Sequence, residues 1–413
     1  MKRRDFLRLG AGLSVAGCAT RSSGARPRVV VVGGGYGGAT AAKHVALEDP
    51  GIEVTLVEPA EAFVSCPLSN LVVGGSRTMA DITRSYAGLA PHGVRLVRDR
   101  AVSIEADKRT LALAHGTALP YDRLIVSPGV DFMLEEVEGY AAAAGRVLHA
   151  WKAGPQTAAL RRQLEAMPDG GVYLLSIPLM PYRCPPAPYE RACQVASYFR
   201  RAKPRSKVLV LDANQEITSE AAHFQSAWNE LYKDLVDYRP NSAVTGIEPG
   251  AVRTDFEKVK ADVLNVVPPQ RAGDIAAAAG LITHNKRWCD VDWRTMQSTA
   301  VPGVHVLGDS TLPASAMPKS GQMAHAQAQV CAAAVVALIR DRAPDPQPEM
   351  TSLCYSFLSE DEAVRLSSVH RYDVAQRTMV PLKGSASLSP ARSRDEAAAA
   401  WRWARDIWSD MLD

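Results

Sequence analysis

The sequence predicts an α/β protein with two Rossmann-like domains and a C-terminal α+β segment. A glycine-rich turn between a buried strand and a helix begins at residue 33, and a second strand–loop–helix pattern begins at residue 172. The 413 residues are too many for one compact core, so we expect at least two domains. With 47% hydrophobic and 22% charged residues, the composition is typical of a globular protein.

Residues 1–26 are expected to form an export signal and a short lead-in. "RRDFLRLG" is a twin-arginine start, and the apolar "AGLSVAG" that follows is too short to span a bilayer. "VAGC" has the form of a lipobox, so Cys18 is either lipidated, which would anchor the protein to a membrane, or discarded or inert after ordinary cleavage nearby. Both outcomes predict the periplasm, an oxidising compartment in which paired cysteines persist.

Charge and cysteine spacing exclude several partners and cofactors. Without residues 1–18, the chain has 43 basic and 43 acidic residues, which does not indicate nucleic-acid binding. No C-x-x-C-H occurs, so no c-type haem is expected on this chain. No cysteine or histidine spacing is that of a metal site, so no metal is expected.

The first domain begins with a dinucleotide-binding pattern. Residues 29–32 are an apolar, β-branched run typical of a buried parallel strand. Gly33, Gly35 and Gly38 form G-x-G-x-x-G at the turn into a helix, whose N-terminus favours a pyrophosphate. Glu58 ends the next strand, 20 residues after Gly38, where an acid takes a ribose hydroxyl. Together these features predict a dinucleotide site.

Two later stretches indicate that the dinucleotide is FAD. "LPYDRLIVSPGV" (119–130) and "VPGVHVLGDST" (301–311) resemble the later motifs of glutathione-reductase-type flavoproteins with two dinucleotide domains. In those proteins the Gly-Asp aspartate binds the ribityl and pyrophosphate region of the flavin, which implies Asp309 here. We expect an FAD domain formed by residues 27–150 and 271–340.

The second domain, residues 151–270, is expected to lack a nicotinamide site. Its first strand, 172–177, runs into "PLMPYRCPPAP", which has five prolines and no glycine. Proline has no amide hydrogen, so this loop cannot offer the run of N–H groups that a pyrophosphate needs. Cys184 stands in the loop instead, which argues against a pyridine-nucleotide oxidoreductase.

The sequence has seven cysteines. Apart from Cys18, three are expected to be structural or core residues: Cys193, Cys289 and Cys331. Three stand beside a proline or an aromatic residue in loop-like surroundings: Cys66, Cys184 and Cys354. The last three are the candidates for chemistry.

With these motifs, the chain resembles the flavoprotein subunit of flavocytochrome c sulfide dehydrogenase. The matching stretches include "CPLSN", "HAWKAGPQT", "RCPPAPYERA", "ADVLNVVPPQRAG", "MPKSG" and "CYS", and they are spread over nearly the whole chain after the signal. The resemblance implies a glutathione-reductase-like fold and a sulfide dehydrogenase. Such an enzyme oxidises hydrosulfide to sulfane sulfur through a redox disulfide and FAD, and reduces a c-type cytochrome carried on a separate chain.

The resemblance also implies roles for the three cysteines. Cys66 matches the family cysteine that is joined to the flavin 8α-methyl carbon by a thioether. The surrounding Val64, Ser65 and Pro67 depart from the usual aromatics, so a non-covalent FAD beside a buried Cys66 stays open. Cys184 and Cys354 match the redox disulfide. The alternatives are a local Cys184–Cys193 pair and a purely structural disulfide.

Three further residues carry implied roles. Glu190, in "PYER", resembles a family acid that handles protons, or it is a glutamate favoured in the first turn of a helix. Lys319 precedes an expected helix at 321–339 and either stabilises negative charge on the reduced flavin ring or is solvated. Trp403 matches a family tryptophan at the flavin. The segment 341–413, with a C-terminal helix, is expected to form the flavin and cytochrome interface.

Three other functions stay open. A sulfide:quinone oxidoreductase would need a membrane-facing surface, which the tryptophan-rich C-terminal helix or a lipid on Cys18 would supply. An NADH dehydrogenase or disulfide reductase would need a second glycine fingerprint, which is missing from the sequence. A non-catalytic flavin-binding subunit would keep FAD without being reduced by sulfide.

Overall fold

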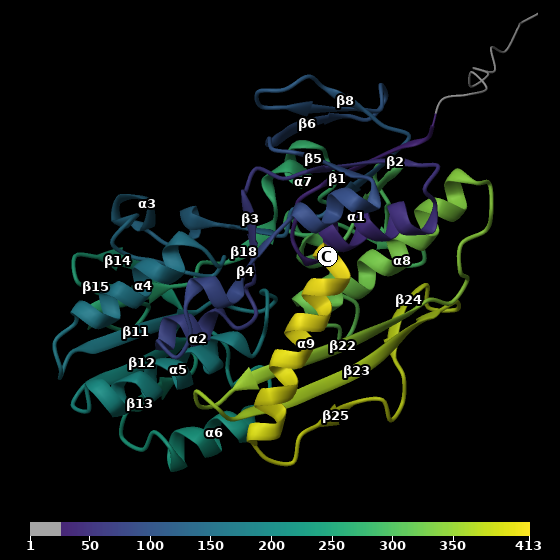
Figure 1. Ribbon diagram of the computed structural model, residues 1–413. Coiled ribbons are helices and arrows are strands. Elements are labelled where there is room, and N and C mark those ends of the chain that lie inside the picture. The colour runs from purple at the N-terminus through teal and green to yellow at the C-terminus, as the bar shows by residue number, and fades with distance from the viewer. Residues whose placement is uncertain (1–25) are drawn as a thin grey trace, which may run out of the picture.

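The computed structural model describes residues 26–413. The twin-arginine motif and Cys18 lie outside these described residues, so the export signal and the lipid anchor stay predictions. Figure 1 shows the second domain on the left and the first domain at the upper right. The C-terminal sheet lies at the lower right, behind the long helix α9 (Arg394–Leu412). The predicted class, an α/β fold with two Rossmann-like domains and a C-terminal α+β segment, is confirmed.

The first domain is built on a seven-stranded sheet in the order β19-β20-β21-β9-β1-β2-β5. Its strands are β1 (Arg28–Val32), β2 (Glu53–Val57), β5 (Val94–Val97), β9 (Arg123–Val126), β19 (Val291–Asp292), β20 (Gln297–Ser298) and β21 (Val304–Val306). The strands from β21 to β5 pair in parallel, and four valines of β1 are buried, as expected for a strand covered on both faces. Because β21 pairs with β9, the chain returns to this sheet after the second domain.

Two long helices lie beside one another against this sheet. Helix α1 (Tyr36–Glu48) follows the glycine turn, and α8 (Gly321–Ile339) has the bounds that the sequence predicts. Ser320 caps α8 by accepting a hydrogen bond from the Met323 N–H at 3.2 Å. By length and composition α8 could cross a membrane, but 67% of its apolar window is buried inside the protein, where it packs on α1 and β22. It is therefore a core helix.

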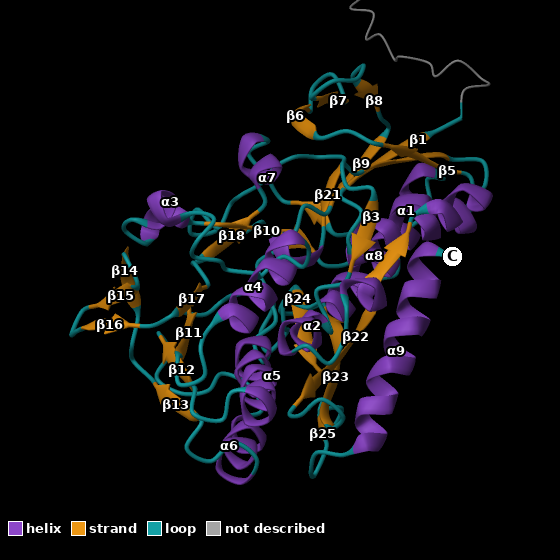
Figure 2. Cartoon of the chain, turned by 60° about the vertical axis from the view of Figure 1, so that its left-hand side comes forward, coloured by secondary structure: helices purple, strands orange, loops and turns teal. Residues whose placement is uncertain are grey.

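The second domain has a parallel four-stranded sheet in the order β13-β12-β11-β17. Its main elements are β11 (Val172–Ile177), β12 (Lys207–Asp212), β13 (Val236–Arg239), β17 (Val263–Val266), α4 (Pro155–Ala166), α5 (Ala187–Ala202) and α6 (Ala221–Glu230). Figure 2 shows α4, α5 and α6 beside this sheet. The proline loop joins β11 to α5, at the place where a Rossmann domain normally has its glycine turn.

Smaller elements complete both domains. The remaining strands are β3 (Ala62–Val64), β4 (Thr83–Ser85), β6 (Ala101–Glu105), β7 (Thr110–Leu113), β8 (Leu119–Pro120), β10 (Val130–Phe132), β14 (Val244–Glu248), β15 (Ala251–Thr254), β16 (Lys258–Lys260) and β18 (Gln270–Ala272). The short helices are α2 (Ser69–Gly74), α3 (Tyr140–Ala143) and α7 (Asp274–Ala278). Two antiparallel sheets, β6-β7-β8 and β14-β15-β16, lie at two separate outer edges of the molecule, at the top and at the left of Figure 2.

The C-terminal segment forms an antiparallel sheet covered by α9. The sheet holds β22 (Glu349–Phe357), β23 (Ala363–Asp373), β24 (Thr378–Pro381) and β25 (Ser387–Leu388), and Cys354 lies within β22. Helix α9 is capped by Ser393, which accepts from the Glu396 N–H at 3.1 Å. Near its end, Asp410 Oδ2 lies 2.9 Å from His44 Nε2 on α1, which ties the C-terminal helix to the first domain.

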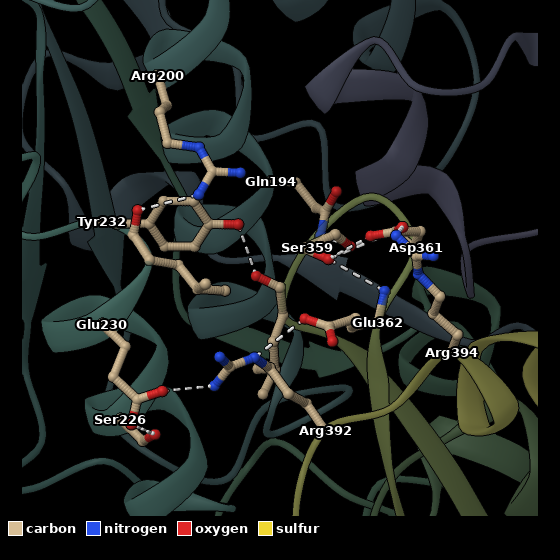
Figure 3. A network of polar contacts seen from close by, with 12 residues as sticks. Gln194, Arg200, Ser226, Glu230, Tyr232, Ser359, Asp361, Glu362, Arg392 and Arg394 are labelled. Carbon is tan, nitrogen blue, oxygen red and sulfur yellow. Dashed lines mark hydrogen bonds and ion pairs between the residues drawn. The ribbon is translucent and has the colours of Figure 1, made fainter.

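The turn after β22 is fastened to the second domain by a network of polar contacts (Figure 3). Gln194 Nε2, on α5, donates to the carbonyl oxygens of Phe357 at 3.0 Å and Ser359 at 2.9 Å. The Tyr232 hydroxyl donates to the Leu358 carbonyl at 2.7 Å. The Arg392 guanidinium bridges carboxylates of the second domain and of the turn, at 3.0 Å from each. These contacts fix the end of the strand that carries Cys354.

Candidate flavin and sulfide site

A cavity of about 850 Å³ opens where the first domain, the second domain and the C-terminal segment meet. Nine of the eleven residues that the sequence singles out as site residues line it: Gly33, Gly35, Glu58, Cys66, Cys184, Glu190, Asp309, Cys354 and Trp403. The other two, Gly38 and Lys319, are outside this lining. The fold therefore brings residues from the whole length of the chain into one cavity.

The three glycines of the dinucleotide turn serve different purposes. Gly33 has φ +94°, which favours glycine, and a Cβ on Gly33 would overlap the Ser127 carbonyl oxygen. A Cβ on Gly38 would overlap the Gly33 carbonyl oxygen, so Gly38 lets the helix start close to the strand. A Cβ on Gly35 would meet no protein atom within 4 Å. Gly35 faces the cavity, where its missing side chain leaves the backbone open to a pyrophosphate.

Two carboxylates on the cavity wall fit the sugar parts of FAD. Glu58 accepts backbone N–H bonds from Gly34 at 2.7 Å and Ala60 at 2.8 Å, which orient it while leaving acceptor sites for a ribose. Asp309 Oδ1 is buried and has no hydrogen-bond partner among the described residues, while Arg183 Nε lies 4.0 Å from Oδ2. A buried oxygen of this kind requires a donor. A ribityl hydroxyl group would provide one.

Cys66 lines the cavity from a tightly held turn. The Cys66 carbonyl accepts from the Ser69 N–H at 3.1 Å and the Ser69 hydroxyl at 2.6 Å. Its Sγ accepts from the Ala153 N–H at 3.4 Å. Pro67, which departs from the family pattern, lines the same cavity, and its carbonyl accepts from the Ser65 hydroxyl at 2.7 Å. Pro67 therefore does not remove Cys66 from the cavity wall.

Cys184 and Cys354 approach the cavity from two different segments. Cys184 has φ +58°, an uncommon backbone conformation for a residue with a side chain, and its N–H donates to the Lys319 carbonyl at 2.7 Å. Cys354 lies within β22, opposite Leu366 of β23. Both cysteines are free in the structure, and both line the same cavity. Burial raises the pKa of the Cys184 thiol well above its usual range and that of Cys354 to about 12.

The described lining gives no support to the local Cys184–Cys193 pair. Cys193 is fully buried on α5 and is outside the cavity wall. It interacts with Trp228 in the core of the second domain, and burial raises the pKa of its thiol. Cys289 and Cys331 are likewise fully buried.

Glu190 is a buried acid beside the two cysteines. It lies in the first turn of α5, is 7% exposed, and accepts from Asn70 Nδ2 at 2.6 Å and from the Phe357 N–H at 2.9 Å. Burial raises the pKa of its carboxyl group to about 7, against the lowering effect of these two donors. A carboxyl group with a pKa in this range can exchange protons near neutral pH.

The sequence reasoning missed two residues that organise this wall. Asn70, the last residue of "CPLSN", holds Glu190 and also accepts from Arg191 Nε at 2.9 Å. Arg191 is 2% exposed, and it donates to backbone carbonyls of His149 at 3.0 Å and Ala150 at 2.7 Å. Both belong to motifs that carry the family resemblance, but nothing in the sequence showed that they are buried and linked to one another.

Lys319 is buried, which excludes the solvated alternative. Its ammonium donates to the carbonyl oxygens of Asp309, at 2.9 Å, and Thr311, and it lies 3.6 Å from the centroid of the Trp288 ring. Burial lowers its pKa to about 7. Its side chain is outside the cavity lining and holds the backbone of Asp309, which lines the cavity. A role of Lys319 towards the flavin ring stays a prediction.

The tryptophans of α9 have different surroundings. Trp403 lines the cavity and donates from Nε1 to Gln322 Oε1 at 2.6 Å. Trp408 is buried, and its Nε1 donates to the Tyr36 hydroxyl at 3.1 Å, so it packs the helix onto the first domain. Trp401 is half-buried near the Arg77 guanidinium.

Three family models match successive parts of the chain. The model of the sulfide dehydrogenase [flavocytochrome c] flavoprotein chain, central, matches residues 157–268, and that of flavocytochrome c sulphide dehydrogenase, flavin-binding, matches 346–412. The pyridine nucleotide-disulphide oxidoreductase model matches 27–163. The flavoprotein chain of sulfide dehydrogenase [flavocytochrome c] from Chlorobaculum thiosulfatiphilum is 67% identical over 45 residues, which are 94% of that sequence and 11% of this chain.

The chain belongs to the flavocytochrome c sulfide dehydrogenase flavoprotein family. Membership makes it a flavin oxidoreductase that acts on sulfide, and the matched flavin domains support binding of FAD. Mitochondrial sulfide:quinone oxidoreductase of Mus musculus is 27% identical over 343 residues, 75% of this chain and 72% of that one. The solved sulfide:quinone oxidoreductase of Aquifex aeolicus shares the fold, with a TM-score of 0.77, 18% identity, and coverage of 93% and 91% of the two chains.

Proposed function

We propose that this chain oxidises hydrosulfide to sulfane sulfur at a Cys184–Cys354 disulfide and passes the electrons through FAD to a c-type cytochrome on a separate chain. One observation carries the proposal. Cys184 and Cys354, 170 positions apart in the sequence, line one cavity together with Cys66 and Glu190. The twin-arginine start supports a periplasmic location, where such a disulfide can persist.

The residues of the cavity wall would hold FAD in a defined way. Gly33 and Gly35 leave room for the pyrophosphate, Glu58 takes a ribose hydroxyl, and Asp309 takes the ribityl region. Cys66 would tether the flavin through a thioether, because it lines the same cavity. When bound, FAD supplies an acceptor that takes an electron pair and returns the electrons singly.

The cysteines carry the sulfur chemistry. Hydrosulfide attacks one sulfur of the disulfide, so that a new S–S bond forms, the old one breaks, and a persulfide and a thiolate remain. A second hydrosulfide takes the outer sulfur away as the hydrogen disulfide anion and leaves a thiol. Two hydrosulfide ions are thus converted into one hydrogen disulfide anion, and Cys184 and Cys354 become one thiol and one thiolate. Re-forming the disulfide releases two electrons and one proton.

Glu190 is the group on the described wall that is suited to accept this proton. Its carboxyl group is buried, lines the same cavity and has a pKa raised by burial to about 7. A base with a pKa near the working pH exchanges protons most effectively. The bonds from Asn70 and Phe357 hold it in one orientation, so it meets the cysteines without rearrangement.

An open groove of about 530 Å³ lies next to the flavin site and offers a route for the electrons. Four residues line both the cavity and this groove: Gln322, Leu353, Tyr355 and Trp403. A carrier docked there would approach the flavin site. The name of the Chlorobaculum relative supports a cytochrome as this carrier. The name of the mouse relative keeps a quinone as the second candidate.

Anaerobic mixing with sulfide tests the proposal. We expect sulfide to bleach the flavin of the wild-type protein and not that of Cys184→Ser or Cys354→Ser. Cys193→Ser is the matched control, because its thiol is outside the cavity. Bleaching in both variants at the wild-type rate would contradict the proposal. Reoxidation by a c-type cytochrome, and not by a soluble quinone, is expected, and the reverse preference would assign the quinone-coupled reaction.

A further inference from the structure

A second buried acid, Glu220, lies close to the cysteines but outside the cavity wall. It is 8% exposed, and both of its carboxylate oxygens accept from the Ser356 hydroxyl, at 3.2 and 3.1 Å. Ser356 lies two residues after Cys354 on β22. Among the described residues, Glu220 forms no ion pair, so nothing cationic within salt-bridge distance compensates for its burial.

The backbone at Glu220 is also unusual. It is the N-cap of α6, but it adopts the left-handed conformation, with φ 53° and ψ 32°, and its side chain makes no capping bond. Serine, aspartate or asparagine would cap this helix better, and glycine would relieve the backbone. The chain instead turns this carboxyl group away from its own helix and towards β22. Strain of this kind, maintained by the surrounding structure, is typical of functional positions.

Glu190 and Glu220 reach consecutive residues of the same strand. Glu190 accepts from the Phe357 N–H, and Glu220 accepts from the Ser356 hydroxyl. Burial is the main cause that raises the pKa of Glu220, and the like charge of Glu190 contributes to it. The pKa of Glu220 is thereby raised to about 7, the same value as for Glu190.

The geometry of this pair is held by the contacts after β22 (Figure 3). Gln194 lies one turn after Glu190 on α5 and fixes the carbonyls of Phe357 and Ser359. Tyr232, just beyond α6, fixes Leu358. The helix that carries Glu190 and the helix that begins after Glu220 are thus fastened to the same strand end.

Among the described residues, the other ionisable groups near Glu190 and Glu220 do not neutralise the negative charge that the two carboxyl groups would carry. Three are thiols: Cys184, Cys193 and Cys354. Arg191 is the cation that acts on Glu190, and it is occupied by backbone and amide partners. Towards the outside, Glu220 meets the half-buried Ser219, whose hydroxyl lies 3.4 Å from Oε2. Glu220 is therefore the outer member of the pair.

We propose that Glu220 is a positioning residue of the sulfide site, and that it acts through Glu190. The two carboxyl groups share one retained proton across β22, so Glu190 stays able to take the proton that leaves the cysteines. When Glu190 accepts that proton, Glu220 can release one on the Ser219 side. This inference rests on the proposed function, because it assigns the proton of that same reaction.

Infrared titration of the purified holoprotein tests the coupling without sulfide turnover. The carboxylic C=O band of Glu190 is isolated by subtracting the spectra of Glu190→Gln at each pH. We expect the pair to titrate in two steps, and Glu220→Gln to leave one step for Glu190, with its midpoint about one pH unit lower. Glu216→Gln, an exposed glutamate in the same loop, is the control and is expected to change nothing.

An unchanged Glu190 midpoint in Glu220→Gln would overturn the inference. If that variant does not fold, Ser356→Ala provides a second test. Loss of the hydroxyl donor is expected to raise the titration midpoint of the pair. An unchanged midpoint would again contradict the coupling. The pH dependence of flavin bleaching by sulfide is expected to shift with the infrared midpoint. If sulfide bleaches the flavin of the wild-type protein at no pH while the infrared coupling is present, the proposed function is refuted. The coupling of Glu190 and Glu220 is then still supported.

Discussion

Replacing Glu190 by glutamine is expected to make the protein more stable at alkaline pH while slowing its reaction with sulfide. The pKa of the carboxyl group is raised by burial from 4.5 to about 7. At ~1.4 kcal/mol for each pKa unit, the ionised form costs about 3 kcal/mol of folding stability. The amide of the variant is neutral at every pH, so it does not carry this cost.

The direction in which the unfolding free energy changes with pH follows from the number of protons that each state binds. Between pH 4.5 and about 7 the folded state keeps a proton that the unfolded state releases, so the unfolding free energy of the wild type falls as pH rises through this window. Glutamine keeps the bond from the Phe357 N–H but loses the one from Asn70, at a cost of about 1 kcal/mol. The variant should therefore be less stable by about 1 kcal/mol below the window, and more stable by about 2 kcal/mol above it.

Chemical unfolding of the holoprotein at acidic and alkaline pH, followed by circular dichroism, measures this difference. Glu135→Gln, at an exposed position, is the control and is expected to show no such change with pH. Flavin bleaching by sulfide should slow by about a hundredfold in Glu190→Gln. If the stability difference between variant and wild type is the same at both pH values, Glu190 is not a buried acid with a raised pKa and the prediction is wrong.

Three further predictions concern the cofactor and the wall that holds it. Cys66→Ser should release its flavin on acid precipitation, whereas the wild type should keep it; release from both would mean that the flavin is not tethered. Asn70→Ala leaves partners on Glu190 and Arg191 unpaired, so unfolding experiments should show a loss of about 2–4 kcal/mol, and a change under 1 kcal/mol would contradict this contact pattern. Gly35→Ala should fold normally, as its Cβ meets no protein atom, but should purify with less flavin relative to protein; full flavin content would show that the pyrophosphate lies elsewhere.

The parts of the site that sequence could predict are those encoded locally. The strand, glycine turn, helix and acid from residue 28 to Glu58 follow from periodicity and backbone sterics, and the structure places them around the cavity. The bounds of α8 follow from an apolar run between Ser320 and the polar residues after Ile339. The proline loop excludes a pyrophosphate turn for a reason visible in the residues themselves.

The parts that sequence could not predict depend on tertiary placement. Nothing local brings Cys184 to Cys354, because a loop of the second domain meets a strand of the C-terminal segment. Glu220 is an ordinary glutamate until burial and Ser356 give it a partner. Lys319 precedes α8, but the position of a residue before a helix does not determine where its side chain points. Its ammonium instead holds backbone carbonyls under Trp288.

Trapping the sulfur on the protein is the most direct test of the proposed mechanism. The oxidised holoprotein is mixed anaerobically with one equivalent of sulfide, quenched with an alkylating agent and analysed by peptide mass spectrometry. The mechanism predicts one added sulfur atom on Cys184 or Cys354, with the other cysteine alkylated as a thiol and Cys193 unmodified by sulfur. Reduction of the flavin with no added sulfur on either cysteine would show that sulfide reacts elsewhere, and would contradict the central claim.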